Sequence, residues 1–171
     1  MGLHSLKDVL TEQLGDLYSA ETQLVTALPK MEKAATHDEL KTAFREHLQE
    51  TKGHVTRVQD ALGELGGPTP TGECKGMKGL ITEGEEIMQM TGDPTAKDAA
   101  LIGAAQRVEH YEIAAYGTAR QLADDCGYDS IKDLMDQTLD EESQADKLLT
   151  KIATGGMFKS GLNQQAATSG A

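Results

Sequence analysis

The chain has 171 residues and a formal net charge of -12, with 16 lysines and arginines against 28 aspartates and glutamates. This length suits one domain around one core, and the acidic balance argues against nucleic acid or an anionic membrane surface as a partner. No apolar run approaches the roughly 18 to 20 residues that span a bilayer, and the amino terminus lacks the features of a signal peptide. We therefore expect a cytoplasmic protein in which Cys74 and Cys126 are free thiols.

The periodic segments are rich in Ala, Leu, Glu, Gln, Met and Lys, which favour helices. Ser5 can cap a first helix that runs to about Ala35, and Asp38 begins a second that ends at Gly66. After a loop over residues 66–73, the pattern predicts three more helices, a short one over about 74–90, a long one from Pro94 to about 126, and a fifth over about 129–155.

The fold class that this order predicts is all-α. Four long helices with a long middle connection are typical of a four-helix bundle made of two antiparallel hairpins joined by a crossover, on which the short helix would lie. We expect one domain over residues 1–156. Residues 157–171 show no sustained periodicity and are rich in small and polar residues, so they are predicted to form a flexible C-terminal tail.

Each long helix has acidic residues in the middle of the apolar seam that should face the core. In the first helix, Glu21 continues a series of leucines spaced by three and four residues. In the acidic run of residues 140–142 only Glu142 fits the seam, so Asp140 and Glu141 are expected on a solvated face. The polar residues near the seam centres are Glu21 in the first helix, His47, Glu50 and His54 in the second, Glu109 and Glu112 in the fourth, and Glu142 and Asp146 in the fifth.

Converging buried carboxylates need a positive charge among them, because an uncompensated one costs several kcal/mol or takes up a proton. Lys52 and Arg107 do not lie on the seam positions, so a metal cation is the simplest source of the positive charge. Carboxylates with a few imidazoles suit iron or manganese. The spacing from Glu21 to Glu50 nearly equals that from Glu112 to Glu142, and such a pseudo-repeat is typical of a dimetal-carboxylate bundle.

Several segments resemble the YciE/YciF-like proteins, a stress-associated bacterial branch of the ferritin-like superfamily: LYSAETQL, HLQET, CKGMKGLI, DAALIGAAQRVEHYEIAAYGTA and TLDEESQAD. The resemblance covers residues 5 to about 155 and implies a ferritin-like bundle, commonly dimeric, with a dimetal centre. The pair Glu109 and Glu112 also resembles the E-x-x-E of rubrerythrin-type centres. The usual E-x-x-H of ferritin-like proteins would place histidine at position 53, where this chain has Gly53, so His54 is the available ligand.

We therefore expect two metal ions per chain, iron before manganese, in a centre that reacts with oxygen or peroxide. Iron oxidation, peroxide reduction and catalase-like turnover are open alternatives. Tyr18 and His47 are expected to orient ligands, although Tyr18 and the other tyrosines also suit the core, and His54 could instead pair with Glu50. The expected ligands are Glu21, Glu50, His54, Glu109, Glu112, Glu142 and Asp146.

Two further expectations concern partners. The small residues of the fourth helix, Ala104, Ala115, Gly117 and Ala119, leave a surface that another helix could approach closely, which predicts a homodimer. The competing interpretation of the whole chain is a non-catalytic helical stress protein whose buried acids are protonated or bridged by water, and which acts through a partner surface.

Overall fold

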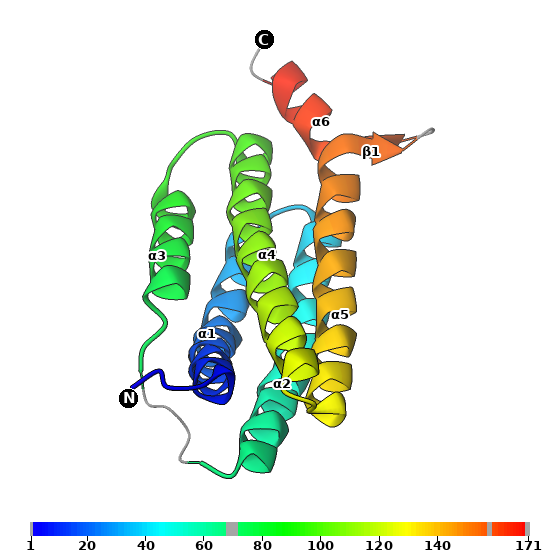
Figure 1. Ribbon diagram of the computed structural model, residues 1–171. Helices are drawn as coiled ribbons and strands as arrows, with labels where there is room; N and C mark the ends of the chain where they lie inside the picture. Colours follow the sequence, from blue (N-terminus) through cyan, green and yellow to red (C-terminus); the bar gives the residue numbers. More distant parts are fainter. Residues whose placement is uncertain (1, 68–71, 157–158, 170–171) are drawn as a thin grey trace.

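A computed structural model describes residues 2–67, 72–156 and 159–169 and shows a bundle of four long helices (Figure 1). The antiparallel pairs α1–α2 and α4–α5 form two hairpins, and α1 also packs on α4 and α2 on α5. The elements are α1 Leu6–Ala34, α2 Asp38–Leu65, α3 Lys75–Gln89, α4 Pro94–Asp125, α5 Asp129–Thr154, β1 Gly155–Gly156, β2 Lys159–Ser160 and α6 Leu162–Ser169.

The helix ends follow the local sequence. The backbone N–H of Asp8 donates to Ser5 Oγ at 3.2 Å, and that of Ala96 donates to Asp93 Oδ1 at 2.9 Å, so both predicted caps form. Gly66 ends α2 with a φ of 72°, a left-handed conformation that favours glycine. The all-α bundle predicted from these signals is confirmed, and within the described ranges no helix is long and apolar enough to cross a membrane.

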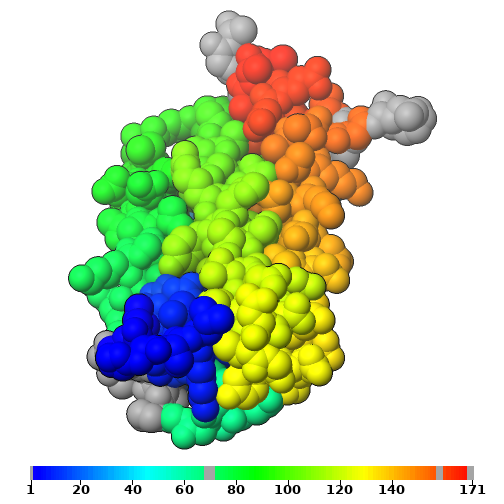
Figure 2. Space-filling model, viewed as in Figure 1, coloured from blue at the N-terminus to red at the C-terminus, as the bar shows by residue number. Residues whose placement is uncertain are grey.

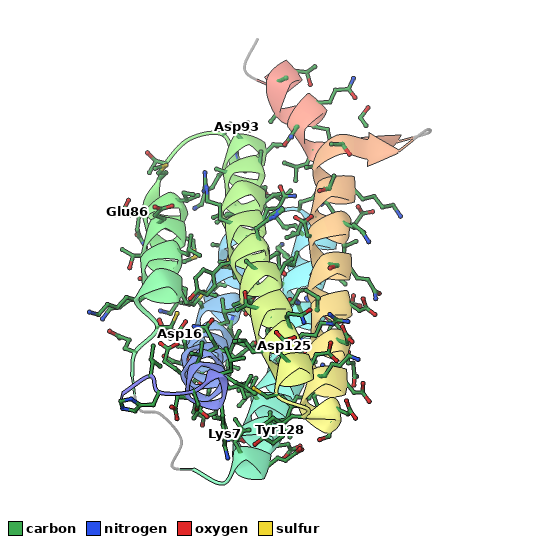
Figure 3. All side chains as sticks on the ribbon, viewed as in Figure 1. Lys7, Asp16, Glu86, Asp93, Asp125 and Tyr128 are labelled. Atoms are coloured by element: carbon green, nitrogen blue, oxygen red, sulfur yellow. The ribbon has the colours of Figure 1, made fainter. Side chains whose placement is uncertain are left out.

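Two contacts between helices of different hairpins fix the register of the bundle. The buried carboxylate of Asp98 on α4 accepts hydrogen bonds from the backbone N–H groups of Thr36 and His37, in the turn between α1 and α2, at 2.7 to 3.1 Å. Lys7 Nζ lies 5.9 Å from the centre of the Tyr128 ring, and Figure 3 shows both side chains at the same end of the bundle. The first contact ties α4 to α1 and α2, and the second ties the start of α1 to the start of α5.

The core consists of two apolar clusters with a polar layer between them. In α1, Leu14 belongs to one cluster and Leu24 to the other, with buried Glu21 between them. In α4, Val108 and Tyr116 likewise flank Glu112. The same order recurs in α2 and α5, so the bundle holds the polar side chains of all four long helices at one level, closed off by apolar residues on either side.

The small-residue surface predicted on α4 is largely used within the chain. Helix α3 packs against α4 and α1, and an ideal Cβ built on Gly84 would lie 4.0 Å from Ala104 Cβ. Ala104 is 4% exposed, and Ala119 is fully buried in the core. The close approach that the small residues allow is therefore made by α3 and by the core, and these two alanines offer no dimer surface.

The segment after residue 156 differs from the irregular tail that composition predicted. Strand β2 pairs antiparallel with β1, and α6 follows it, packing on α4 and α5 beyond the end of the bundle (Figure 2). Leu162 is 1% exposed and belongs to the core cluster next to α5. In α6 one buried apolar residue, Leu162, is followed by residues that favour helices. The segment is too short to show helical periodicity in the sequence. Residues 157–158 and 170–171 lie outside the described ranges.

Candidate metal centre

The polar layer brings buried acids and imidazoles from all four long helices together. Each of these residues is at most 7% exposed. They form two groups, within each of which the candidate ligand atoms lie within 4.8 Å of one another. One group is His47, Glu109, Glu112 and Glu142, and the other is Glu21, His54 and Glu142.

Glu142 belongs to both groups and lies between the two histidines. Its Oε1 is 2.9 Å from His54 Nδ1, and its Oε2 is 3.6 Å from His47 Nε2. Each histidine also faces a second carboxylate, since His54 Nδ1 is 3.4 Å from Glu21 Oε1 and His47 Nε2 is 3.6 Å from Glu109 Oε1. Glu142 therefore presents one oxygen to each group.

Most of the inward-facing atoms have no hydrogen-bond partner of good geometry among the described residues. Such buried, unsatisfied polar atoms are rare, because each costs about 1 to 3 kcal/mol or more. A cation among them would satisfy them together. The atoms are Glu21 Oε2, His47 Nε2, His54 Nδ1, Glu109 Oε2, both oxygens of Glu112 and both oxygens of Glu142.

Each histidine is held from outside the layer by another carboxylate. His47 Nδ1 lies 3.2 Å from Glu50 Oε2, and His54 Nε2 lies 2.9 Å from Glu141 Oε2. Glu141 is itself held by Arg57, whose Nη2 donates to Oε1 at 2.9 Å. A histidine that donates its outer N–H to a carboxylate presents the lone pair of its other nitrogen inward, which is how metal-binding histidines are commonly oriented.

Tyr116 completes the layer on the side of α1. Its buried hydroxyl donates to Glu21 Oε1 at 2.5 Å, which leaves the other oxygen of Glu21 for the centre. Sequence analysis assigned Tyr116 only to the core or an interface. The signal that could have found it is its position four residues after Glu112, on the same face of α4.

Without a cation, protons compensate part of the negative charge. Burial lowers the pKa of His47, but Glu109, Glu50 and Glu142 raise it more, to about 9. Burial also lowers the pKa of His54, whereas hydrogen bonds and charges of Glu142 and Glu21 raise it to about 10. The apo centre therefore holds charged imidazoles at neutral pH.

The pKa values of the carboxyl groups in the layer shift in different directions, depending on which side chains lie next to them. Burial raises the pKa of Glu21, Glu109 and Glu112, and the last two lie well above the ordinary value. Burial raises that of Glu142 as well, but the hydrogen bond and charge of His54 and the charge of His47 lower it on balance. Glu142 is thus the acid that stays ionised between the two imidazoles.

Glu50, Asp146 and Tyr18 do not reach the two groups, contrary to the sequence prediction. The side chain of Glu50 is 47% exposed, because the seam of α2 passes through His47, Thr51 and His54 and leaves Glu50 on its flank. The sequence predicted that His47 would orient Glu50 as a ligand. In the structure Glu50 instead orients His47, and His47 faces the centre.

Asp146 lies on the flank of α5, and Tyr18 of α1 is partly buried against the apolar cluster that contains Leu14. Asp146 Oδ1 accepts a hydrogen bond from Gln106 Nε2 at 3.1 Å, and the Tyr18 hydroxyl accepts one from Gln59 Nε2 at 3.1 Å. A helix turns about 100° per residue, so Asp146, four positions after Glu142, does not point in the same direction as Glu142. It can therefore face the flank of α5 and not the centre. Glu141, which was expected on a solvated face, instead supports His54.

Comparison with known proteins agrees with this architecture. A family model described as "Domain of unknown function (DUF892)" matches residues 5–167. Protein YciF of Escherichia coli (strain K12) is 40% identical over 165 residues, which make up 96% of this chain and 99% of YciF. The crystal structure of the E. coli stress protein YciF superposes with a TM-score of 0.84, covering 86% of this chain and 94% of that one at 41% identity.

Two other solved structures are similar. YcfI from Rhodopseudomonas palustris has a TM-score of 0.85 at 37% identity, covering 89% of this chain and 97% of that one. A ferritin-like, diiron-carboxylate protein from Bacillus anthracis str. Ames has a TM-score of 0.66 at 16% identity, covering 88% and 98% of the two chains. At that identity the likeness shows the fold alone, and it confirms the predicted ferritin-like bundle.

Proposed function

Since the chain belongs to the DUF892 family and is similar to the E. coli stress protein YciF, we propose that it is a ferritin-like metal protein acting in stress. It binds two metal ions between its four long helices, iron before manganese, and carries out redox chemistry with oxygen or peroxide. The free thiols of Cys74 and Cys126 support a cytoplasmic location, where thiols stay reduced. A homodimer remains part of the proposal, to be tested by the sedimentation mass.

The observation that carries the proposal is the set of inward atoms that have no hydrogen bond of good geometry among the described residues. Carboxylate oxygens with two imidazole nitrogens, buried between apolar clusters, match the donors that iron and manganese prefer. One ion would be held by His47, Glu109, Glu112 and Glu142, and the other by Glu21, His54 and Glu142. Among the described residues neither cysteine belongs to the two groups, since buried Cys74 contacts Asp16 and Tyr111 and Cys126 caps the end of α4.

The bound metals would supply reversible one-electron changes, which no side chain of the layer provides by itself. The protein contributes orientation and proton positions. Glu50 and Glu141 hold the two histidines by their outer nitrogens, and Tyr116 holds a proton at Glu21 Oε1. The apolar clusters on both sides exclude bulk water, which limits side reactions and strengthens the electrostatic interactions within the layer.

One observation favours the alternative of a non-catalytic helical stress protein. Two charged imidazoles, with pKa values raised to about 9 and about 10, offset negative charge of the layer without a metal, and burial, which raises the pKa of Glu109 and Glu112, favours their neutral forms. In that case the layer would be a structural feature, and the protein would act through its surface.

Anaerobic loading followed by oxidant separates these functions. Apo protein is mixed with ferrous iron, and hydrogen peroxide or oxygen is then added while ferrous loss and oxidant consumption are followed. The proposal predicts oxidation faster than in protein-free buffer for the wild type and the protein-free rate for a Glu112→Gln, Glu142→Gln double variant. Equal rates for the wild type and that variant would leave the redox function without support.

A further inference from the structure

A pocket between α2 and α5 leads from the surface to the candidate centre. Its volume is about 260 Å³, and it reaches His47 and Glu109, which belong to the first ligand group. The other group lies beyond Glu142 and does not line this pocket. The lining residues are Ala43, Phe44, Glu46, His47, Glu50, Glu109, Glu141, Gln144, Ala145, Leu148 and Leu149.

The pocket is lined by two exposed acids of α2 and by the buried Glu109 of α4. Glu46 is exposed and lies one helical turn before Glu50, whose side chain is 47% exposed. Farther in, the side chains of His47 and Glu109 are 8% and 4% exposed. His47 Nε2 and Glu109 Oε2 have no hydrogen-bond partner of good geometry among the described residues, so the deep end of the pocket offers unsatisfied donors for a cation.

On α5 the pocket is lined by three apolar residues together with Glu141 and Gln144. Ala145 and Leu149 line it, with Leu148 at the rim, 40% exposed. Ala145 contributes only a methyl group to this wall, so a larger side chain at this position would fill part of the pocket. Glu141 also lines the pocket, but Arg57 compensates its charge.

We propose that this pocket is the passage by which divalent cations reach and leave the centre, with Glu46 and Glu50 as successive transient ligands. The inference rests on the proposed metal-binding function and gives Glu50 a different place from the resident ligand predicted from sequence. Carboxylates at successive depths attract a cation and replace its hydration stepwise. They would repel an anion, and an uncharged oxidant would gain nothing from them.

A passage has a kinetic signature that a ligand or a structural residue lacks. A substitution that only narrows the route slows loading and release by the same factor, so the dissociation constant is unchanged. Loss of a resident ligand instead weakens the equilibrium affinity. Glu50 is unsuited to this test because it also orients His47, and its removal would change both quantities.

The experiment follows Co²⁺ binding to apo protein by stopped-flow absorbance, and its release into excess chelator. Ala145→Phe fills the pocket, with Ala145→Leu as a smaller blocking variant should phenylalanine lower the melting temperature. Ala114→Phe, at an exposed position of α4, is the matched control. Glu46→Gln removes the outer charge, and Glu83→Gln on exposed α3 surface is its control.

We expect Ala145→Phe to slow loading and release together by about tenfold or more, and Glu46→Gln to slow loading by about threefold in low salt only. Both controls keep the wild-type rates. Wild-type loading rates in both blocking variants, or weaker equilibrium binding with unchanged loading, would overturn the passage while the metal centre stands. Failure of the wild-type protein to bind Co²⁺, Fe²⁺ or Mn²⁺ at all would instead overturn the proposed function and the passage with it.

Discussion

Glu141 holds the outer nitrogen of His54, with Oε2 at 2.9 Å from Nε2, while the inner Nδ1 lies 2.9 Å from Glu142. Arg57 holds Glu141 in turn through both of its oxygens. The pKa of Glu141 is raised by burial and lowered more by Arg57 and His54, to about 2, so the carboxylate is charged throughout the physiological range. This chain of contacts fixes which nitrogen of His54 faces the centre.

Replacing Glu141 tests whether this support serves metal binding. Glu141→Ala should weaken metal affinity by about 10 to 100-fold, because His54 loses the acceptor that orients it. Glu141→Gln keeps an acceptor oxygen and should lose less metal affinity than Glu141→Ala. Affinity is measured by competition with a metal-binding dye, with Asp140→Asn at the exposed neighbouring position as the control. Equal affinities for all the variants would argue that His54 has only a structural role.

The double variant Glu112→Gln, Glu142→Gln separates ligands from scaffold. It keeps the side-chain volumes and removes two buried acids, so it should abolish metal binding, while the apo bundle should lose stability wherever His47 and His54 are charged, because Glu142 is their ionised partner. Metal should stabilise the wild type by about 3 to 4 kcal/mol at a free concentration a few hundredfold above the dissociation constant. Thermal melts with and without iron or manganese measure both effects. A metal-dependent shift that persists in the variant would exclude these acids as ligands.

The stability of the apo protein should fall as pH rises. His47 and His54 have folded pKa values of about 9 and about 10 against an ordinary 6.5, so their contribution is complete below pH 6.5 and is lost as pH rises through 9 to 10. Burial raises the pKa of Glu109 and Glu112, which acts in the same direction. The lowered pKa of Glu141 adds stability that is already complete above its ordinary 4.5.

Melting temperatures of chelator-treated protein at pH 6.5, 8 and 9.5 test this trend. We expect a steady decrease for the wild type and a smaller decrease for a His47→Gln, His54→Gln variant. The melting temperature of metal-loaded protein should decrease less over the same range. A bound cation replaces the protons, and the affinity of the protein for the metal rises with pH. An apo melting temperature that increases over this range would show that the imidazoles are neutral in the fold.

Asp146 provides a test in which sequence and structure predict opposite results. The pseudo-repeat makes it a ligand, whereas in the structure it accepts a hydrogen bond from Gln106 and lies 3.5 Å from His110 Nε2. Asp146→Asn should therefore keep the wild-type metal content, and Glu109→Gln should reduce it. Elemental analysis of the two variants side by side decides between them, and a loss in Asp146→Asn would restore the sequence-based assignment.

The four-helix bundle and the level of the polar layer were predictable because they depend on periodicity. Glu21, Glu112 and Glu142 interrupt long apolar seams, and a seam position alone is enough to place them in the interior. Glu109 lies three residues before Glu112, a spacing that places it on the adjoining edge of the same helix face. These four acids lie together in the structure as the sequence suggested, and their role as ligands stays a prediction.

The details of the layer depend on contacts that no single-helix pattern contains. Glu50 and Asp146 lie one step off their seams, where a small rotation of the helix decides between interior and flank. The hydrogen bond from Tyr116 to Glu21 joins α4 to α1, and the one between His54 and Glu141 joins α2 to α5. Both histidines of the layer come from α2, and Asp146 of α5 stays outside the two groups.

The central claim is that the polar layer binds a pair of metal ions, and metal stoichiometry tests it most directly. Protein purified without chelators is reconstituted with ferrous iron or manganese without oxygen, freed of loose metal by gel filtration, and analysed for metal and protein. The account predicts about two ions per chain for the wild type and close to none for the Glu112→Gln, Glu142→Gln variant. A wild-type content below about 0.2 ion per chain after reconstitution with either metal would contradict it.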